Sequence, residues 1–281
     1  MTSTPALDIG GQAVIEGVMI KSRHKLAVAV RLENGQIKIK KEKLKPLPRV
    51  LRLPFIRGFA TLFHITLIGI EALLWSAHQA VGEEERLGWK EIAGTLLVSM
   101  IFGLVLFLGV PLLITELSPV SGGFSHLFEG IVRLLIFLIY VYAISFMSDV
   151  HRLFQYHGAE HMAANCYEYG EALTVENVQK YSTVHPRCGT SFIMLVLIIS
   201  VILFSFISVS AWYEKLIWRL ALLPVVAGVS YEILRFSGRF RNSRFALWLV
   251  APGQWVQKIT TQKPTKRMVE VAIASLDAVT K

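Results

Sequence analysis

The sequence predicts a mainly α-helical integral membrane protein with about four transmembrane helices, one amphipathic helix and a small cytosolic β-hairpin element near the N-terminus. Its 281 residues are 53% hydrophobic and only 17% charged, whereas soluble domains carry roughly 25% charged residues. Four nearly uncharged stretches are long enough to cross a hydrocarbon core about 30 Å thick, which takes roughly 20 helical residues. Alternating apolar and polar residues around Asn34-Gly35 are typical of a hairpin.

Residues 1–54 are expected to form the cytosolic N-terminal β-element. The stretch KLAVAVRLENGQIKIKK places the hairpin at about residues 25–42. The preceding GGQAVIEGVM, residues 10–19, is typical of a packed strand whose glycines let another element approach closely. Glu16 in this strand is a candidate to reach a cytosolic site. No basic segment followed by an apolar one opens the chain, so we expect no cleavable signal peptide.

Residues 55–91 are expected to form an amphipathic, interfacial helix followed by a loop. Within residues 55–81, four polar residues recur every seven positions, which keeps them on one slowly drifting helix face. They are Arg57, His64, Glu71 and His78. We interpret this segment as a helix that lies in the membrane interface or leans on the bundle. A solvated stripe explains its polar face, and the alternative is a functional Glu71 flanked by histidines.

A four-helix membrane domain is expected in residues 92–235. Its predicted spans are residues 92–115, 127–147, 192–212 and 216–234. The segments before, between and after these spans contain, in order, 14, 0, 3, 1 and 9 Lys and Arg residues. This alternation places both termini in the cytoplasm. We therefore expect a multi-pass protein of the inner (plasma) membrane, with the lipid bilayer as its first partner. The net charge of +9 is interpreted first as an orientation signal, the usual role of basic residues in a membrane protein, with a ribosome or an anionic lipid surface as the alternative partner and no specific nucleic-acid motif.

The predicted topology brings distant polar segments to one cytosolic face. The region 148–191 contains HGAEH, residues 157–161, and leads into HPRCGTSF, residues 185–192. The segment SYEILRF, residues 230–236, ends the fourth span on the same side. The cytosolic C-terminal tail, residues 236–281, is expected to contain a short amphipathic helix over residues 264–280.

His157, Glu160 and His161 are expected to share one helix face, because positions i, i+3 and i+4 are neighbours on a helix. Two imidazoles at this spacing can hold one divalent metal. Zinc is the metal that the pattern favours, since His-x-x-Glu-His is the order of the inverted zinc peptidases, in which the glutamate polarises a metal-bound water. Glu160 is therefore the candidate catalytic residue. The alternative is a set of ordinary polar residues at the end of a membrane segment.

Three more side chains are candidate metal ligands. His185 and Cys188 form a short His-x-x-Cys loop that can chelate zinc; the simpler interpretation is a helix entry with a buried thiol. Glu232 lies inside a predicted span, where a carboxylate is costly and is usually paired or functional. It is either a metal or active-site ligand or the partner of Arg235. Four His and Cys ligands would complete a structural site, whereas an open position would give Glu160 the role of a base.

These motifs, together with APGQWVQKITTQKPTKRMVEVAIASL near the end of the chain, resemble those of the YqhQ-type bacterial membrane family in content and order. That family is a domain of unknown function whose members are often labelled metal-dependent enzymes. The resemblance covers nearly the whole chain. It implies a membrane protein in which His157, Glu160, His161, His185 and Cys188 are the residues behind the enzyme label.

The function predicted from the residues is that of a metal-dependent hydrolase at the cytosolic membrane interface, with a peptide or a lipid-linked molecule as substrate. The alternative is a non-enzymatic factor with a structural metal site, which assists membrane-protein assembly or contacts ribosomes through its basic N-terminal region. A transporter is the third class, because Arg133, Arg219 and Glu232 lie within spans. The absence of an internal repeat disfavours it.

Overall fold

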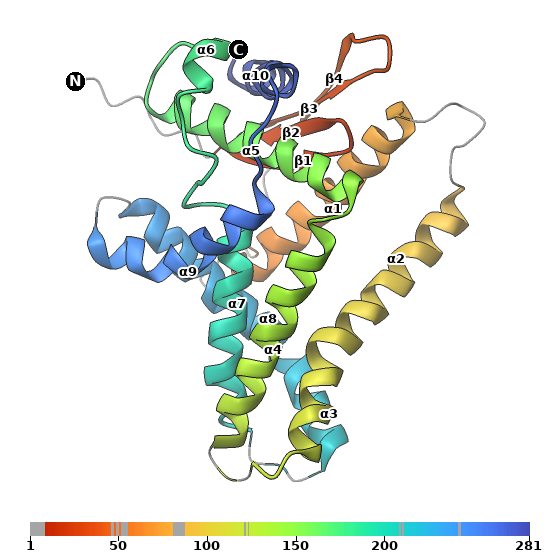
Figure 1. Ribbon diagram of the computed structural model, residues 1–281, viewed down its shortest axis with the longest axis vertical. Coiled ribbons are helices and arrows are strands. Elements are labelled where there is room, and N and C mark those ends of the chain that lie inside the picture. Colours follow the sequence, from red (N-terminus) through yellow and green to blue (C-terminus); the bar gives the residue numbers. More distant parts are fainter. Residues whose placement is uncertain are drawn as a thin grey trace.

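A four-stranded sheet with three helices around it lies at one end of a bundle of long helices (Figure 1). The computed structural model describes residues 9–45, 48, 51, 56–80, 88–120, 122, 124–207, 209, 211–240 and 243–281. Parts of the predicted segments lie outside the described residues. These parts include the start of the N-terminal element, its predicted junction with the amphipathic helix at residues 54 and 55, and positions 208 and 210 of the third predicted span.

The sheet is an antiparallel meander in the order β1-β2-β3-β4. Its strands are β1 (Gly10–Val14), β2 (Gly17–Lys21), β3 (Lys25–Arg31) and β4 (Ile37–Lys43). The predicted hairpin is confirmed as β3 and β4, and its turn uses Gly35 at a φ of 84°. The stretch expected as one packed strand is instead the pair β1 and β2, because the chain reverses at Ile15 and Glu16.

Glu16 takes a φ of 54°, which is uncommon for a residue with a side chain. Its carboxylate accepts hydrogen bonds from Arg152 and from the Tyr156 hydroxyl. These contacts join the turn between β1 and β2 to the helix α5 (Ser148–Glu168). The expectation that Glu16 reaches a metal site is therefore not met, since its carboxylate serves this joint.

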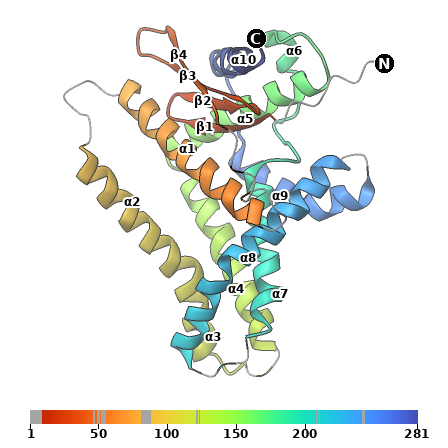
Figure 2. The ribbon, with the colours of Figure 1, turned by 180° about the vertical axis from the view of Figure 1, so that it is seen from behind.

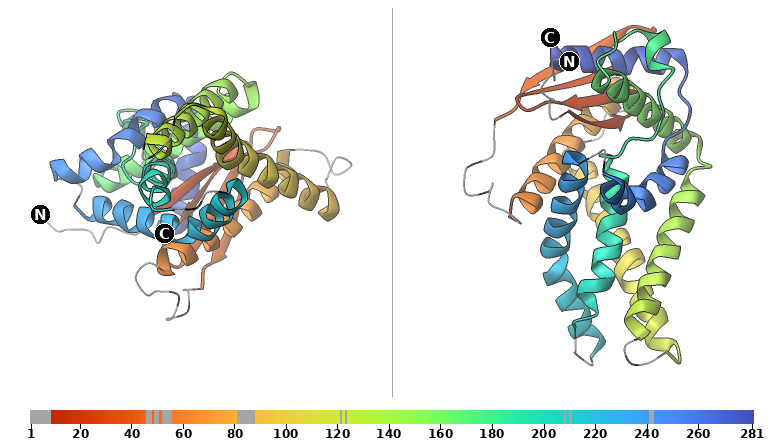
Figure 3. Two further views of the ribbon diagram at one scale, coloured as in Figure 1. Left: turned by 90° about the horizontal axis from the view of Figure 1, so that it is seen from below. Right: turned by 90° about the vertical axis from the view of Figure 1, so that its left-hand side faces the viewer.

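Both faces of the sheet are covered (Figure 3). On one face, α5 and the C-terminal helix α10 (Lys266–Thr280) bury side chains such as Ile20, Ala27 and Leu276. On the other face, the second half of α1 (Ile56–Ala80) packs Ala72 against Val28 and its neighbours. The short helix predicted near the C-terminus is thus confirmed as α10, and it belongs to the core around the sheet.

The helix α1 extends from the sheet towards the bundle (Figure 2). It is long and apolar enough to be a candidate membrane span. Its second half, however, is fixed to the sheet, where the Ser76 hydroxyl accepts a hydrogen bond from the Ile15 backbone and Glu71 pairs with Lys40 at 2.9 Å. In its first half, Gly58 approaches the backbone of Gly228 in α8 (Trp212–Arg239). α1 thus contacts both the sheet and the bundle, the interfacial position expected for it stays a prediction, and the Glu71 side chain is 62% exposed.

Three further helices have the length and hydropathy of membrane spans. They are a continuous helix made of α2 (Trp89–Leu104), one π-helical turn (Val105–Gly109) and α3 (Val110–Leu117), then α4 (Phe124–Ile144), and α8. The third predicted span is shorter than expected: α7 (Gly189–Phe204) has 16 residues, about 24 Å at 1.5 Å per residue. It runs beside α4 and α8 in the bundle (Figures 1 and 3).

The bundle has apolar side chains outside and polar ones inside. Every residue of α2 is at least partly exposed, including Val98 at 67%. In contrast, Glu129, Arg133 and Arg219 are at most 4% exposed. Such a distribution is stable only in an apolar solvent, because lipid solvates the outer side chains and buried charges must find partners within the protein. The protein is therefore an integral membrane protein.

The helix α9 (Arg244–Thr260) was not predicted as a separate element of the C-terminal tail. It lies beside α7 and α8, at a lower level than the sheet, and projects to one side of the bundle (Figures 1 and 2). Its exposed side chains include Phe245, Trp248 and Trp255, and such aromatic residues are typical of the membrane–water interface. The position of α9 thus marks the level at which the bundle meets the soluble part.

Candidate metal centre

The two histidines of HGAEH lie in the middle of α5, which follows α4 after a break at residues 145–147. Their rings are 4.4 Å apart between centroids, as expected for positions i and i+4. Gly158, between them, lets the helix approach the segment after α9 so closely that a Cβ would lie 2.1 Å from the carbonyl oxygen of Gln262. This contact brings the end of α9 within reach of His157.

A backbone carbonyl fixes each imidazole. His157 Nδ1 lies 2.8 Å from the Thr260 oxygen, and His161 Nδ1 lies 2.6 Å from the Thr183 oxygen. Since a carbonyl can only accept a hydrogen bond, each Nδ1 carries the proton and each Nε2 keeps a lone pair. Burial lowers the pKa of both histidines, which favours the neutral rings. A metal-binding histidine usually donates its protonated ring nitrogen to such an acceptor, while the other ring nitrogen binds the metal.

Cys188 completes a group of three ligand atoms. Its Sγ lies 3.3 Å from Nε2 of His157, and the potential ligand atoms of His157, His161 and Cys188 all lie within 4.8 Å of one another. The sulfur caps the N-terminus of α7, where it accepts a hydrogen bond from the Thr190 backbone at 3.4 Å. Imidazole and thiolate together suit zinc.

Glu160 lies beside this group. It is 5% exposed, and its Oε2 lies 3.5 Å from Nε2 of His161. Burial raises the pKa of its carboxyl group, while positive charges on His157 and His185 would act in the opposite direction. The carboxylate rests on Gly11 of β1, where a Cβ would come within 2.3 Å of Oε1. The structure therefore brings together four of the predicted site residues: His157, Glu160, His161 and Cys188.

His185 lies near the group, but both of its ring nitrogens have protein partners. Nδ1 accepts a hydrogen bond from the Arg187 backbone at 3.3 Å, and Nε2 lies 3.2 Å from Oε1 of Glu168. Burial opposes ionisation of Glu168, yet the hydrogen bonds and charges of His185 and Arg187 outweigh it and lower the pKa of this carboxyl group. His185 thus acts as a support, with its ring 5.7 Å from that of His161.

Glu232 differs from the prediction of a metal ligand. Its carboxylate accepts two hydrogen bonds from the guanidinium of Arg57 in α1, at 2.7 and 2.6 Å. Within the described part of the chain, its oxygens do not belong to the group of potential ligand atoms around His157. Glu232 joins α8 to α1, and Arg57 is a partner that the sequence did not predict.

The family described as "Protein of unknown function (DUF1385)" matches residues 53–281. The chain belongs to this family. The "Uncharacterized protein YqhQ" of Bacillus subtilis (strain 168) is 35% identical over 288 residues, which cover 95% of this chain and 91% of the relative. No solved structure matches. The resemblance to the YqhQ-type family is thus confirmed, and neither description names an activity.

Sequence reasoning missed several residues of the site in this DUF1385 protein. Thr183 and Thr260 act through backbone carbonyls, which leave no signal in a sequence. Gln257 is fully buried and bonds to both the backbone N–H and the carbonyl of His185, at 2.8 and 3.0 Å. A polar residue within the apolar helix α9 was the one available signal for Gln257. Gly11 carried a different signal, because a cluster of glycines indicates that another element approaches the backbone closely.

Proposed function

We propose that this protein is a zinc-dependent hydrolase of the plasma membrane, with its active site at the cytosolic interface. The supporting observation is the convergence of two imidazole lone pairs and one thiol within 4.8 Å, beside the buried carboxyl group of Glu160. Three protein ligands leave the fourth zinc position to water or substrate, which is the arrangement of catalytic sites. The sequence order His-x-x-Glu-His is consistent with the same assignment.

The residues of the site have separate roles in this proposal. His157, His161 and Cys188 would hold the metal, and a bound zinc ion supplies Lewis acidity and lowers the pKa of a coordinated water. The Thr260 and Thr183 carbonyls keep the two rings oriented. Glu160 is placed to accept a proton from an attacking water and to return it to a leaving group. A nearby cation favours its carboxylate form and so offsets the effect of burial.

The surroundings of the site support the proposed location and substrate class. Both the sheet and α10 lie at the same end of the bundle as the site (Figure 1), and the Lys and Arg distribution assigns that end to the cytoplasm. The His157 imidazole is fixed by the last residue of α9, whose exposed tryptophans belong at the membrane surface. A substrate reaching this level is a peptide or a lipid-linked molecule, which is the class we propose.

A structural metal is the second candidate function, and the burial of the group favours it. His161 and Cys188 are 2% and 6% exposed, and the three ligands join α5 to the start of α7. A metal there would tie the soluble part to the bundle. The protein would then be a non-enzymatic factor for membrane-protein assembly, which contacts ribosomes or membrane-protein partners through its basic N-terminal region.

A Glu160→Gln variant separates the two functions. The test measures zinc content after purification in detergent, together with complementation of a strain that lacks the gene. The hydrolase predicts that zinc is retained and complementation is lost, because only the base is removed. The control is Glu176→Gln, an exposed position of the same soluble part, which should keep both. Full complementation by Glu160→Gln with normal zinc would refute the hydrolase and leave the structural role.

A further inference from the structure

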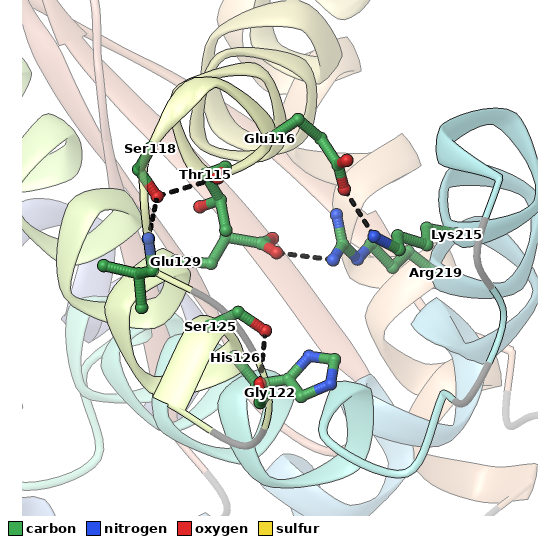
Figure 4. A pocket seen from close by; sticks show the side chains of 10 residues that line it. Thr115, Glu116, Ser118, Gly122, Ser125, His126, Glu129, Lys215 and Arg219 are labelled. Atoms are coloured by element: carbon green, nitrogen blue, oxygen red, sulfur yellow. Dashed lines mark hydrogen bonds and ion pairs between the residues drawn. The ribbon is translucent and has the colours of Figure 1, made fainter.

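A cavity of about 250 Å³ (Figure 4) lies between helix ends at the end of the bundle farthest from the sheet (Figure 1). It is lined by the end of α3, the start of α4 and the start of α8. Its charged and titratable residues are Glu116, His126, Glu129, Lys215 and Arg219. None of them belongs to the candidate metal centre, which is at the opposite end of the molecule.

Arg219 is the most unusual of these residues. It is 1% exposed, and one of its nitrogens, Nη2, donates to Oε2 of Glu129 at 2.5 Å. Within the described ranges, its Nε and Nη1 have no hydrogen-bond partner. A buried donor without an acceptor is costly, more so when it is charged. Two guanidinium nitrogens, with three N–H bonds between them, therefore lack an acceptor at the wall of the cavity that Arg219 lines.

The charges of the cluster indicate the sign of that ligand. Glu129 is shared, because its Oε1 accepts a hydrogen bond from Nη2 of Arg133 at 2.5 Å. The other two guanidinium nitrogens of Arg133 donate hydrogen bonds to the Phe107 carbonyl and the Ser200 hydroxyl, both at 3.0 Å. Two guanidinium groups thus face one carboxylate, which leaves one positive charge. Of the guanidinium nitrogens of these two arginines, those without a partner in the described part of the chain belong to Arg219.

The rest of the cavity does not cancel this charge. Lys215 pairs with Glu116 at the rim, and this pair is neutral as a whole. The ring of Phe204 lies under both guanidinium groups, at 5.1 Å from Arg133 and 5.7 Å from Arg219. A cation–π contact lowers the cost of burying the charge, but it supplies no acceptor to the free N–H groups. A bound anion would supply an acceptor for these N–H groups and a negative charge to balance the remaining positive charge.

We propose that this cavity binds a phosphate group through Arg219 and Lys215. The planar guanidinium matches phosphate oxygens with paired N–H donors, and a lysine adds a second cation. The level of the cavity fits a phospholipid headgroup, because the exposed Trp212, Tyr213 and Trp218 beside it on α8 are typical interface residues. A soluble phosphate compound has the same chemistry, and the experiment distinguishes the two sources.

The experiment titrates detergent-purified protein with dihexanoyl phosphatidylglycerol and, separately, with inorganic phosphate, by calorimetry. Lys215→Gln should weaken binding by about tenfold or more, since a charge-assisted hydrogen bond is lost. Glu116→Gln should strengthen binding, because it removes the carboxylate that competes for Lys215. Lys25→Gln is the control, since Lys25 is an exposed residue of β3 and its loss changes the charge equally; it should leave binding unchanged.

Lys215→Gln and Glu116→Gln are expected to change the affinity in opposite directions, and a variant that merely failed to fold could not bind more tightly. Saturable binding of the lipid but not of inorganic phosphate assigns a headgroup, and comparable binding of both assigns a soluble phosphate compound. The proposal is overturned if the folded wild-type protein binds neither probe. It is equally overturned if Lys215→Gln and Glu116→Gln change affinity in the same direction, or no more than Lys25→Gln does.

Discussion

The two buried polar clusters, at opposite ends of the molecule, leave different groups unsatisfied. In the cluster of His157, His161 and Cys188, backbone carbonyls take up the imidazole N–H donors, so that lone pairs and a thiol remain. In the cluster of Arg133, Glu129 and Arg219, the carboxylate is fully shared, so that N–H donors remain. The first cluster therefore suits a cation and the second an anion.

The difference teaches how burial acts on different side chains. An imidazole responds to burial by losing its proton, which makes it a ligand for a metal. A guanidinium keeps its charge at any accessible pH, so it must find an anion or remain uncompensated. Exclusion from water thus favours a cation site where the buried groups are imidazoles and an anion site where they are guanidinium groups. Four variants test this contrast, from the largest expected effect to the smallest.

Glu129→Gln should have the largest effect on stability. The variant leaves Arg133 and Arg219 without the carboxylate that both contact, and removal of one partner from a buried ionic cluster typically costs about 3–5 kcal/mol. The measurement is thermal or denaturant unfolding in detergent. Glu33→Gln, at an exposed position, is the control. A loss below about 1 kcal/mol would show that the two arginines do not depend on Glu129.

Gly158→Ala should destabilise the soluble part by about 1–3 kcal/mol, because the added methyl group would overlap the Gln262 carbonyl. We also expect weaker zinc retention, since the displacement moves Thr260 away from His157. Gly94→Ala is the matched control: nothing lies within 4 Å of its added Cβ, and alanine suits a helix better than glycine. Equal stability of both variants would contradict the close contact of α5 with the segment after α9.

Glu232→Gln should leave the zinc content unchanged, because the Glu232 carboxylate is engaged with Arg57. Elemental analysis of the purified variant checks this expectation. Loss of zinc in Glu232→Gln would restore Glu232 to the metal centre and contradict the structure.

The ion pair between Arg57 and Glu232 should make the smallest contribution to the free energy of unfolding. Both side chains are about a quarter exposed, at 28% and 24%, so a double-mutant cycle with Arg57→Gln and Glu232→Gln should give a coupling energy of about 1 kcal/mol or less. Thermal unfolding of the wild type, both single variants and the double variant provides the cycle. A coupling as large as the loss in Glu129→Gln would remove the contrast between a partly exposed pair and a buried cluster.

The sequence predicted those features that depend on local geometry. Asn34-Gly35 specifies its turn by backbone chemistry, and the spacing of His157 and His161 places them on one face in any helix. Cys188 joined them because the predicted topology put its segment on the same side of the membrane. The failures concern partners that are distant along the chain: Arg57 is 175 residues from Glu232.

Other failures have equally physical causes. The end of α7 was misplaced because hydropathy continues past Phe204 although the helix does not. The carbonyl acceptors of Thr183 and Thr260 are common to every residue type, so no pattern reveals them. His185 was assigned to the metal because its spacing from Cys188 fits a chelating loop. Its ring nitrogens instead contact the Glu168 carboxylate and the Arg187 backbone N–H, and these contacts exist only in the folded chain.

Elemental analysis of detergent-purified protein tests the metal centre most directly. The wild type is compared with a double variant, His157→Ala and His161→Ala, and with His151→Ala, which removes an exposed histidine of the same helix. We predict near-stoichiometric zinc in the wild type and in His151→Ala, and its loss in the double variant. Equal metal content in all three proteins, or a wild type without a transition metal, would contradict the assignment.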